Sequence, residues 1–299
     1  KEYRRQRQMC IRDRLAPVRQ QLEELGCVTE EAEPDLSGAD DIFVLVDAWR
    51  QSADAGPKVN KDTTNEELFK ILCDMLKPLK DGHVNLKAKG LGSKKKKIFN
   101  PEDTPRFFKE FNTGKLEKQF GNLVFKTLKD KGFGEQKEAT ELLVYTRNKD
   151  YGYLLITEFE GVSKRSLEKG LVKVLGEMKG IKGLIVDIRL NPGGTDQCVY
   201  LITSRFADKK RVGHHRKTKN GPGEDEFSEL KKRHLMPADN TFTGPIVLLT
   251  HDASFSAADV FAMLMADLPH VTIIAEPTNG IFSNMLEKKQ PNGWKYTLS

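Results

Sequence analysis

The chain has 299 residues, of which 38% are hydrophobic and 31% charged, a size that suits one large domain or two ordinary ones. It contains no apolar run of about 18 residues, so no transmembrane segment is expected. The four cysteines, Cys10, Cys27, Cys73 and Cys198, share no metal-ligand spacing and are too few for a disulfide scaffold. The composition therefore indicates a globular chain with a substantial core and excludes collagen-like and disulfide-rich classes.

The net charge of +6 is concentrated at the beginning of the chain. Residues 1–14, KEYRRQRQMCIRDR, carry +4 of it, which leaves +2 for the rest of the sequence. This stretch has no apolar periodicity and resembles a translated sequencing adapter, so we expect it to be foreign to the protein. A genuine basic arm is the alternative. The small charge of the remainder argues against a nucleic-acid partner.

Residues 15–90 are expected to form a helical N-terminal region. Residues 63–67 have the pattern of a helix start, with acidic residues in the first turn. The apolar stripe that follows at helical spacing ends near Pro78. The segment KDGHVNL (80–86) then forms a glycine turn that leads into a strand.

Residues 91–150 are expected to be a charged connecting segment. Its four consecutive lysines at 94–97 indicate a solvated loop, with a site for an anionic partner as the alternative.

From residue 151 to residue 299, strands and helices alternate. Its strands are short apolar runs, which are typical of a buried parallel sheet. The strand–helix repeats predict an α/β core with right-handed crossovers. Functional sites in such sheets form beyond the carboxyl ends of the strands. Strands are expected at 153–157, 183–189, 245–250 and 271–275, and helices at 167–178, 197–206 and 257–268.

The first candidate site segment is Asn191-Pro192-Gly193-Gly194, just past the strand that ends at Arg189. Paired glycines let backbone N–H groups approach a ligand closely and donate to a developing oxyanion. A tight strand-to-helix turn is the alternative interpretation.

The second candidate is Ser256, which lies between the strand at 245–250 and the helix at 257–268. The amino end of a helix favours negative charge, so Ser256 is a candidate nucleophile and the Ala257 N–H a second oxyanion donor. Two alternatives stay open. Serine is a preferred N-cap residue, and Ser254 is a rival nucleophile.

The third candidate is His83, because a serine hydroxyl needs a base and histidine is the usual one near neutral pH. His83 lies on a glycine-containing turn between an apolar helix and a strand. His251 is the rival, at a strand end five residues before Ser256. The other histidines are interpreted as surface residues: His214 and His215 in a charged loop at 209–219, His234 and His270.

Together these segments resemble the C-terminal processing (tail-specific) serine peptidase family, which also includes tricorn-type core proteases and retinoid-binding relatives. The resemblance implies a helical N-terminal region and a crotonase-like (ClpP/crotonase) α/β core. Many members carry a PDZ domain between the positions of His83 and Tyr151, but no PDZ-like run of strands is found there, so none is expected. The matching pieces are KDGHVNL (80–86), GYLLITEF (152–159), GLIVDIRLNPGG (183–194), SFSAADVF (254–261) and AEPTNG (275–280).

The resemblance places the nucleophile on Ser256 and the oxyanion donors on the NPGG turn and the Ala257 N–H. One branch of the family uses a Ser–Lys dyad, whose lysine aligns on Ile281 here. The other branch, which is similar to tricorn, uses a histidine base that falls on His83, although Gly82 stands where that branch has a serine. The chain is therefore expected to be closer to the histidine-base branch.

In that branch an acidic residue orients the histidine from a position further toward the C-terminus. We expect this residue beyond residue 299, and we expect the chain to be a fragment truncated at both ends.

The resemblance implies a serine-type endopeptidase that cleaves peptides or proteins through an acyl-enzyme, with Ser256 as nucleophile and His83 as general base. No cofactor or metal is expected, and family members are mostly extracytoplasmic, either periplasmic or secreted. Two alternatives stay open. One is a non-catalytic ligand-binding protein on the same fold, and the other is a crotonase-type acyl-CoA enzyme with Glu276 or Asp259 as its base.

Overall fold

The computed structural model describes most of the chain from residue 63 onward, in two compact units. Among the described residues, no helix has the length and apolar character needed to cross a bilayer. The segment expected to be foreign, at 1–14, lies outside the described residues, as does the first half of the lysine run at 94–97. The described ranges are 63–91, 96–101, 116–218, 220, 226–290 and 292–298. Unit 1 comprises Lys1–Asp103, Lys217–Leu230 and Asn284–Ser299, and unit 2 comprises Thr104–Arg216 and Lys231–Ser283.

Unit 1 contains the helix α4 (Asn65–Leu76), which begins as the sequence predicts. The Thr64 side chain accepts the Glu67 N–H, and the Glu67 carboxylate accepts the Thr64 N–H, so the two residues form a capping box. A short 3₁₀ helix, η1 (Lys77–Leu79), ends the apolar stripe, and Lys80 then reverses the chain with a φ of 47°.

A four-stranded antiparallel sheet completes unit 1, in the order β11-β12-β1-β2. Strand β1 lies between β2 and the last strand of the chain, so residues more than 200 positions apart pair directly, with Leu86 opposite Tyr296. Apolar side chains of α4 pack on this sheet, and the Phe69 and Trp294 rings meet edge to face. The strands are β1 (Asn85–Ala88), β2 (Lys97–Phe99), β11 (Leu286–Lys289) and β12 (Lys295–Leu298).

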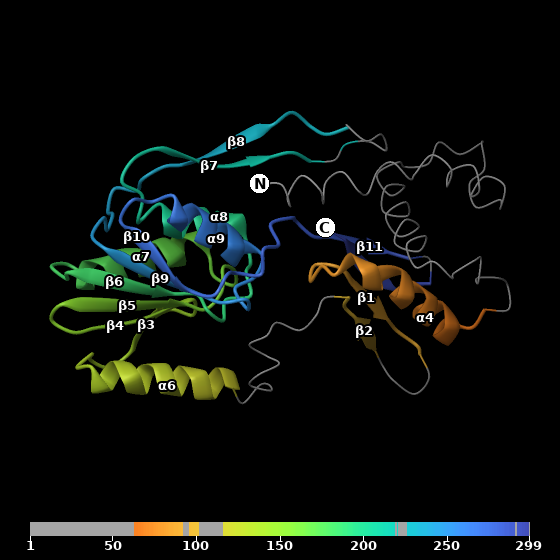
Figure 1. Ribbon diagram of the computed structural model, residues 1–299, viewed down its shortest axis with the longest axis horizontal. Coiled ribbons are helices and arrows are strands. Elements are labelled where there is room, and N and C mark those ends of the chain that lie inside the picture. Colours follow the sequence, from red (N-terminus) through yellow and green to blue (C-terminus); the bar gives the residue numbers. More distant parts are fainter. Residues whose placement is uncertain are drawn as a thin grey trace. The chain divides into compact units, whose positions relative to one another are not determined.

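Unit 2 is built on a six-stranded mixed sheet in the order β10-β9-β6-β5-β4-β3 (Figure 1). The pairs β5–β6, β6–β9 and β9–β10 are parallel, which confirms the predicted α/β pattern, while β3 and β4 are antiparallel additions from within residues 91–150. The strands are β3 (Lys137–Thr140), β4 (Leu143–Arg147), β5 (Tyr151–Ile156), β6 (Gly183–Asp187), β9 (Ile246–Thr250) and β10 (Val271–Ala275).

Helices cover both faces of this sheet, so unit 2 has three layers. On one face α7, α8 and α9 enclose the main apolar core together with the sheet. On the other face the α6 residue Phe125 packs edge to face on Tyr153 of β5. The helices are α6 (Leu116–Asp130), α7 (Lys164–Glu177), α8 (Asp196–Thr203) and α9 (Ala257–Ala266).

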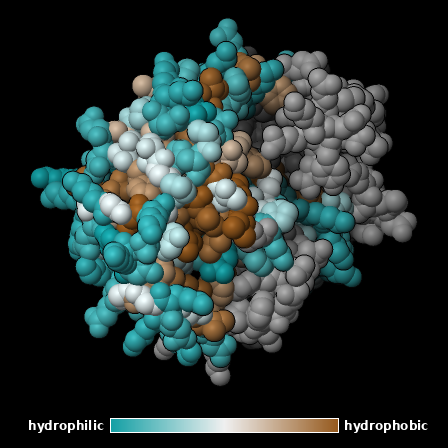
Figure 2. Space-filling model, turned by 60° about the vertical axis from the view of Figure 1, so that its left-hand side comes forward, coloured by the Kyte–Doolittle hydropathy of each residue, from teal (hydrophilic) through white to brown (hydrophobic). Residues whose placement is uncertain are grey.

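The two edges of the six-stranded sheet differ. The outer strand β3 carries Lys137 and Glu138 and has an irregular register, features that oppose edge-to-edge association. The opposite edge strand, β10, exposes Ile273 and Ile274. Figure 2 shows hydrophobic residues among hydrophilic ones at the molecular surface.

A separate two-stranded ribbon extends from unit 2 on the side of the sheet that α7, α8 and α9 cover (Figure 1). It consists of β7 (Arg211–Arg216) and β8 (Lys231–Leu235), which pair antiparallel. The interpretation of residues 209–219 as a loop is therefore wrong, because most of this segment forms β7. His214 is also half-buried, with its Nδ1 3.0 Å from the Tyr200 hydroxyl.

Candidate active site

The NPGG turn follows the carboxyl end of β6 and is held by the fully buried Asn191. The Asn191 side chain donates to the Ile156 carbonyl (3.0 Å) and accepts the Gly193 N–H (2.9 Å). Its backbone carbonyl accepts the Phe255 N–H (3.1 Å). One side chain and its backbone thus join the end of β5, the glycine turn and the loop that precedes α9. The sequence analysis assigned no role to Asn191.

The glycine pair allows an approach that a side chain would prevent. Gly193 has a φ of +102°, and a Cβ there would lie 2.8 Å from the Ser256 Cβ and 3.0 Å from the Ala257 nitrogen. Gly194 has a φ of +137°, and a Cβ there would lie 2.4 Å from the Phe159 carbonyl carbon. Only glycine combines these φ values with such contacts, so the pair brings the turn against Ser256.

Ser256 precedes α9 with a φ of 59° and a ψ of −113°. A non-glycine residue in this region costs on the order of 1–3 kcal/mol and is found mainly at functional sites. Ser256 is the N-cap residue of α9 by position, but its side chain makes no capping hydrogen bond, so capping does not account for the serine side chain. The residue is half-buried.

Two backbone N–H groups are candidate oxyanion donors: that of Ala257, which follows Ser256, and that of Gly194, which follows the glycine that lies against Ser256. Within the described part of the chain, the N–H groups of Gly194 and Ala257 meet no acceptor. The Gly193 N–H differs, because it donates to the Asn191 side chain and would have to leave it to serve as an oxyanion donor. Paired N–H groups next to a hydroxyl have the chemical character of an oxyanion hole.

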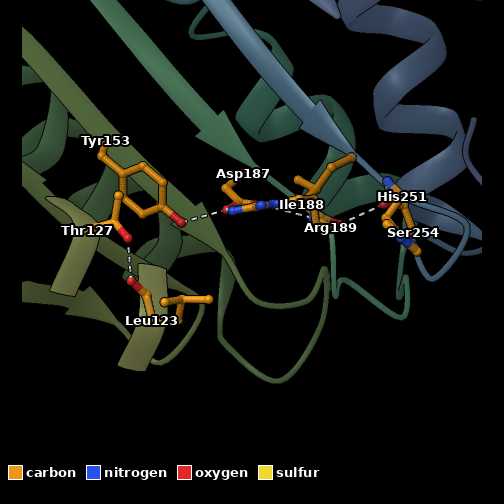
Figure 3. Close-up of polar contacts among 8 residues, drawn as sticks. All are labelled: Leu123, Thr127, Tyr153, Asp187, Ile188, Arg189, His251 and Ser254. Carbon is orange, nitrogen blue, oxygen red and sulfur yellow. Dashed lines mark hydrogen bonds and ion pairs between the residues drawn. The ribbon is translucent and has the colours of Figure 1, made fainter. Parts of the chain in front are cut away.

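Ser254, the rival nucleophile, is fully buried and engaged (Figure 3). Its hydroxyl donates to the Ile188 carbonyl (2.8 Å) and accepts the His251 N–H (3.1 Å). These bonds fasten the loop after β9 to the segment after β6, so the hydroxyl of Ser254 has a structural role.

Asp259 holds the other side of the same loop. Its carboxylate is 1% exposed and accepts the N–H groups of Gly280 (2.6 Å) and Ile281 (3.2 Å). It also accepts hydrogen bonds from the Thr278 side chain and the Ser256 backbone, while burial raises its pKa. A carboxylate so occupied is not available as the free base that the acyl-CoA alternative requires.

Asp259 is a residue whose role the sequence analysis missed, although a signal was present. It lies at the third position of α9, and a carboxylate there commonly accepts the N–H of the N-cap residue, as in a capping box.

A buried ion pair fixes the end of β6 immediately before the NPGG turn. Asp187 is fully buried and accepts from the Tyr153 hydroxyl (2.6 Å) and from the Arg189 guanidinium (2.6 Å). The guanidinium lies over the Phe120 ring of α6, 4.6 Å from its centroid. Figure 3 shows that these side chains reach Asp187 from β5 and from the segment after β6.

Comparisons with known proteins identify the family of the chain. The model of peptidase family S41 matches residues 150–299, half of the chain. The chain belongs to peptidase family S41. The predicted resemblance to C-terminal processing peptidases is thereby confirmed at the level of the family.

Two curated relatives of this S41 chain come from Bacillus subtilis. The carboxy-terminal processing protease CtpA is 30% identical over 152 residues, which are 50% of this chain and 30% of the relative. CtpB is 27% identical over 129 residues, 43% of this chain and 25% of the relative. The matches therefore span less than a third of these relatives.

A solved structure covers more of the S41 chain. A candidate peptidase from Parabacteroides merdae has 26% identity and a TM-score of 0.63, over 92% of this chain and 78% of its own.

His83, the expected base of the S41 chain, belongs to unit 1. The residue is 2% exposed, its backbone N–H donates to the Asp81 carboxylate (2.7 Å), and its backbone carbonyl accepts the Thr297 hydroxyl (2.6 Å). Burial lowers the pKa of His83, although the nearby Asp81 carboxylate raises it in part. The lowered pKa favours the neutral imidazole, the form that a general base requires. Ser256 belongs to unit 2, so the pairing of the two residues stays a prediction.

His251, the rival base, lies between two carboxylates at the ends of β9 and β10. Its Nδ1 is 2.5 Å from Asp252 Oδ1, and its Nε2 is 3.6 Å from Glu276 Oε2. Together the three side chains form a group with metal-ligand chemistry, with the ligand atoms within 4.8 Å of one another. The sequence analysis, which expected no metal, did not foresee this group.

Proposed function

We propose that this S41 chain is a serine-type endopeptidase of the tail-specific type, built on a crotonase-like core. One observation carries the proposal. Ser256 adopts a φ of 59°, leaves its helix uncapped and lies against the Gly193 backbone. A strained serine beside unoccupied N–H donors suits a nucleophile better than a structural residue.

In the proposed reaction the Ser256 hydroxyl oxygen attacks the carbonyl carbon of a substrate peptide bond. The carbonyl oxygen then gains negative charge and accepts hydrogen bonds from the Gly194 and Ala257 N–H groups. Loss of one such donor typically costs about 3–4 kcal/mol of transition-state stabilisation. Gly193 supplies the close approach, and its N–H is a third donor if Asn191 releases it.

His83 is the proposed general base, on the basis of the resemblance to the histidine-base branch. It takes the hydroxyl proton of Ser256 during attack and returns it to the leaving amine. It then activates the water that hydrolyses the acyl-enzyme. The substrate class that follows is a peptide or protein.

The test combines activity with covalent labelling. A fluorophosphonate probe should label the wild type and not Ser256→Ala, and peptide hydrolysis should fall by at least about 10³-fold in the variant. Ser254→Ala is the matched control: it removes a structural hydroxyl two residues away, so it should slow the labelling by loosening the loop but not abolish it. Equal hydrolysis by Ser256→Ala and the wild type would overturn the assignment of the nucleophile.

A non-catalytic binding protein on the same fold is the second candidate. The observation that favours it is the buried Ile281, which stands where the Ser–Lys branch has its lysine. This candidate requires ligand binding without turnover and no reaction of Ser256 with the probe, so the same labelling experiment separates the two functions.

A further inference from the structure

The ribbon formed by β7 and β8, here called the basic ribbon, concentrates positive charge on two short strands. Their sequences are RVGHHR and KKRHL. The register sets His215 opposite Lys232 and Arg216 opposite Lys231. Because neighbouring residues of a strand point to opposite faces, the basic ribbon has an inner and an outer face.

The inner face is anchored to α8. Arg233 lies over the Tyr200 ring, 3.9 Å from its centroid, and its guanidinium is 3.1 Å from the Asp196 carboxylate. Gly213 permits the approach, since a Cβ there would lie 2.3 Å from the Tyr200 hydroxyl oxygen. The adjoining Leu235 is buried, so this face is committed to packing.

The outer face and the far end of the ribbon are exposed and carry basic side chains. His215, Lys232 and His234 are exposed on the outer face, and Arg216 and Lys231, which by alternation belong to the face of Arg233, are exposed at the far end. Within the described residues, none of the lysines or arginines in this group forms an ion pair, whereas inner-face Arg233 pairs with an aspartate.

The anchoring contact also gives the basic ribbon its position relative to the candidate site. Asp196, the partner of Arg233, is the first residue of α8 and comes two residues after Gly194. The base of the ribbon is therefore attached next to the proposed oxyanion turn, within the same unit. We expect a substrate chain that passes this turn to reach the ribbon.

We propose that the basic ribbon binds an acidic segment of the protein substrate close to the cleaved bond. The inference rests on the proposed peptidase function and adds a substrate class to it. Both outer edges of the two-stranded ribbon lack a strand partner among the described residues, so an extended peptide can pair along one of them. An added strand presents every second side chain to one face, which predicts acidic residues at alternate positions.

The experiment uses two fluorogenic peptides that differ only in glutamate or glutamine at three alternate positions. With the wild type at low salt, kcat/KM should favour the acidic peptide by about tenfold, since each exposed charge pair contributes a modest amount. The preference should decline at high salt because of screening. The double variant Lys231→Glu, Lys232→Glu should abolish or reverse the ratio, whereas Lys169→Glu, on the solvent-exposed side of α7, should keep it.

Binding separates this proposal from the catalytic one. Ser256→Ala should bind a labelled acidic peptide more tightly than the glutamine peptide, and the preference should disappear in the triple variant that also carries both lysine reversals. Equal dissociation constants for the two peptides would overturn the role of the basic ribbon even if Ser256 is the nucleophile. Tighter, ribbon-dependent binding of an RNA oligomer or an anionic vesicle would also overturn it. Absence of hydrolysis of both peptides would instead count against the proposed function.

Discussion

The two regions that the proposed reaction needs are organised in different ways. The serine corner, residues 191–194 and 254–259, is held by buried hydrogen bonds from several segments of unit 2. The histidine turn, residues 80–85, is held by a short turn and by the pairing of β1 with β12 near the end of the chain. Each region is thus preorganised by its own core. A substitution can therefore disable one region and leave the other folded.

The largest expected effect comes from replacing the general base. The two candidates for the base, His83 and His251, are each replaced by glutamine. His83→Gln should lower kcat/KM by roughly 10³–10⁴-fold, the usual consequence of losing the base of a serine nucleophile. His251→Gln, which lies beside the serine corner, should have a much smaller effect. The measurement is steady-state hydrolysis of a fluorogenic peptide, with circular dichroism to verify folding.

The pH profile gives the same prediction an independent measurement. Burial lowers the pKa of His83, so its neutral form persists below the ordinary value of 6.5. Activity should therefore fall only as the pH drops below about 6.5, and the acid limb should be absent from residual activity in His83→Gln. If His251→Gln removes the activity and His83→Gln does not, the base lies beside the serine corner in unit 2, and the histidine turn is not needed for the reaction.

The second prediction concerns the close approach inside the serine corner. In Gly193→Ala the new Cβ would meet the Phe255 carbonyl oxygen at 2.6 Å and the Ser256 Cβ at 2.8 Å, at a φ of +102°. We expect a destabilisation of about 2–4 kcal/mol and a loss of activity of about 100-fold or more, because the turn must move away from Ser256. Urea denaturation and peptide hydrolysis measure the two effects.

Gly161→Ala is the matched control for this clash. Gly161 has a similar φ of +93°, but its nearest neighbour would be the Glu158 side chain at 3.7 Å. Gly161→Ala should therefore lower the free energy of unfolding only by the backbone strain, about 1 kcal/mol, and should keep the activity. Equal effects of the two substitutions would mean that strain alone, and not the contact with Ser256, explains the need for glycine.

The difference between the two regions also explains what could be predicted from the sequence. Strands β6, β9 and β10 were recognisable because buried parallel strands are continuous apolar runs, and β10 begins and ends where the pattern predicts. The pairing of β1 with β12 could not be predicted from the sequence, because no local pattern specifies a strand partner more than 200 residues away. The role of Ser256 was inferred from motifs, but its positive φ was not, because serine rarely adopts one.

Polar residues with structural roles were the hardest to assign. Asn191 acts through partners in its own turn and on two other segments, and sequence spacing does not reveal them. Asp259 was considered only as a possible base, whereas its surroundings show a buried acceptor for backbone N–H groups. The chemistry of a side chain was therefore readable from the sequence, but the tertiary contacts that select one of its roles were not.

The smallest expected effect on activity concerns Asp259, which we expect to position Ser256 without touching the substrate. Asp259→Asn keeps the size of the side chain but replaces one acceptor oxygen by a donor NH₂, which faces backbone N–H groups. Bonds to a charged acceptor contribute about 1.5–3 kcal/mol, so the variant should be destabilised by a similar amount. Because the Ser256 backbone is one of the donors, kcat should fall roughly tenfold with little change in KM.

Asp187→Asn provides the control, because Asp187 is as buried as Asp259 but has different partners. Its carboxylate pairs with the Arg189 guanidinium and accepts the Tyr153 hydroxyl. The variant should lose stability without the selective loss of kcat, because neither partner is part of the serine corner. Parallel losses of kcat in the two variants would show that general destabilisation explains both. A fall in kcat confined to Asp259→Asn would mean that the positive φ of Ser256 depends on the carboxylate at the third position of α9, and that the serine corner owes its geometry to more than the glycine turn.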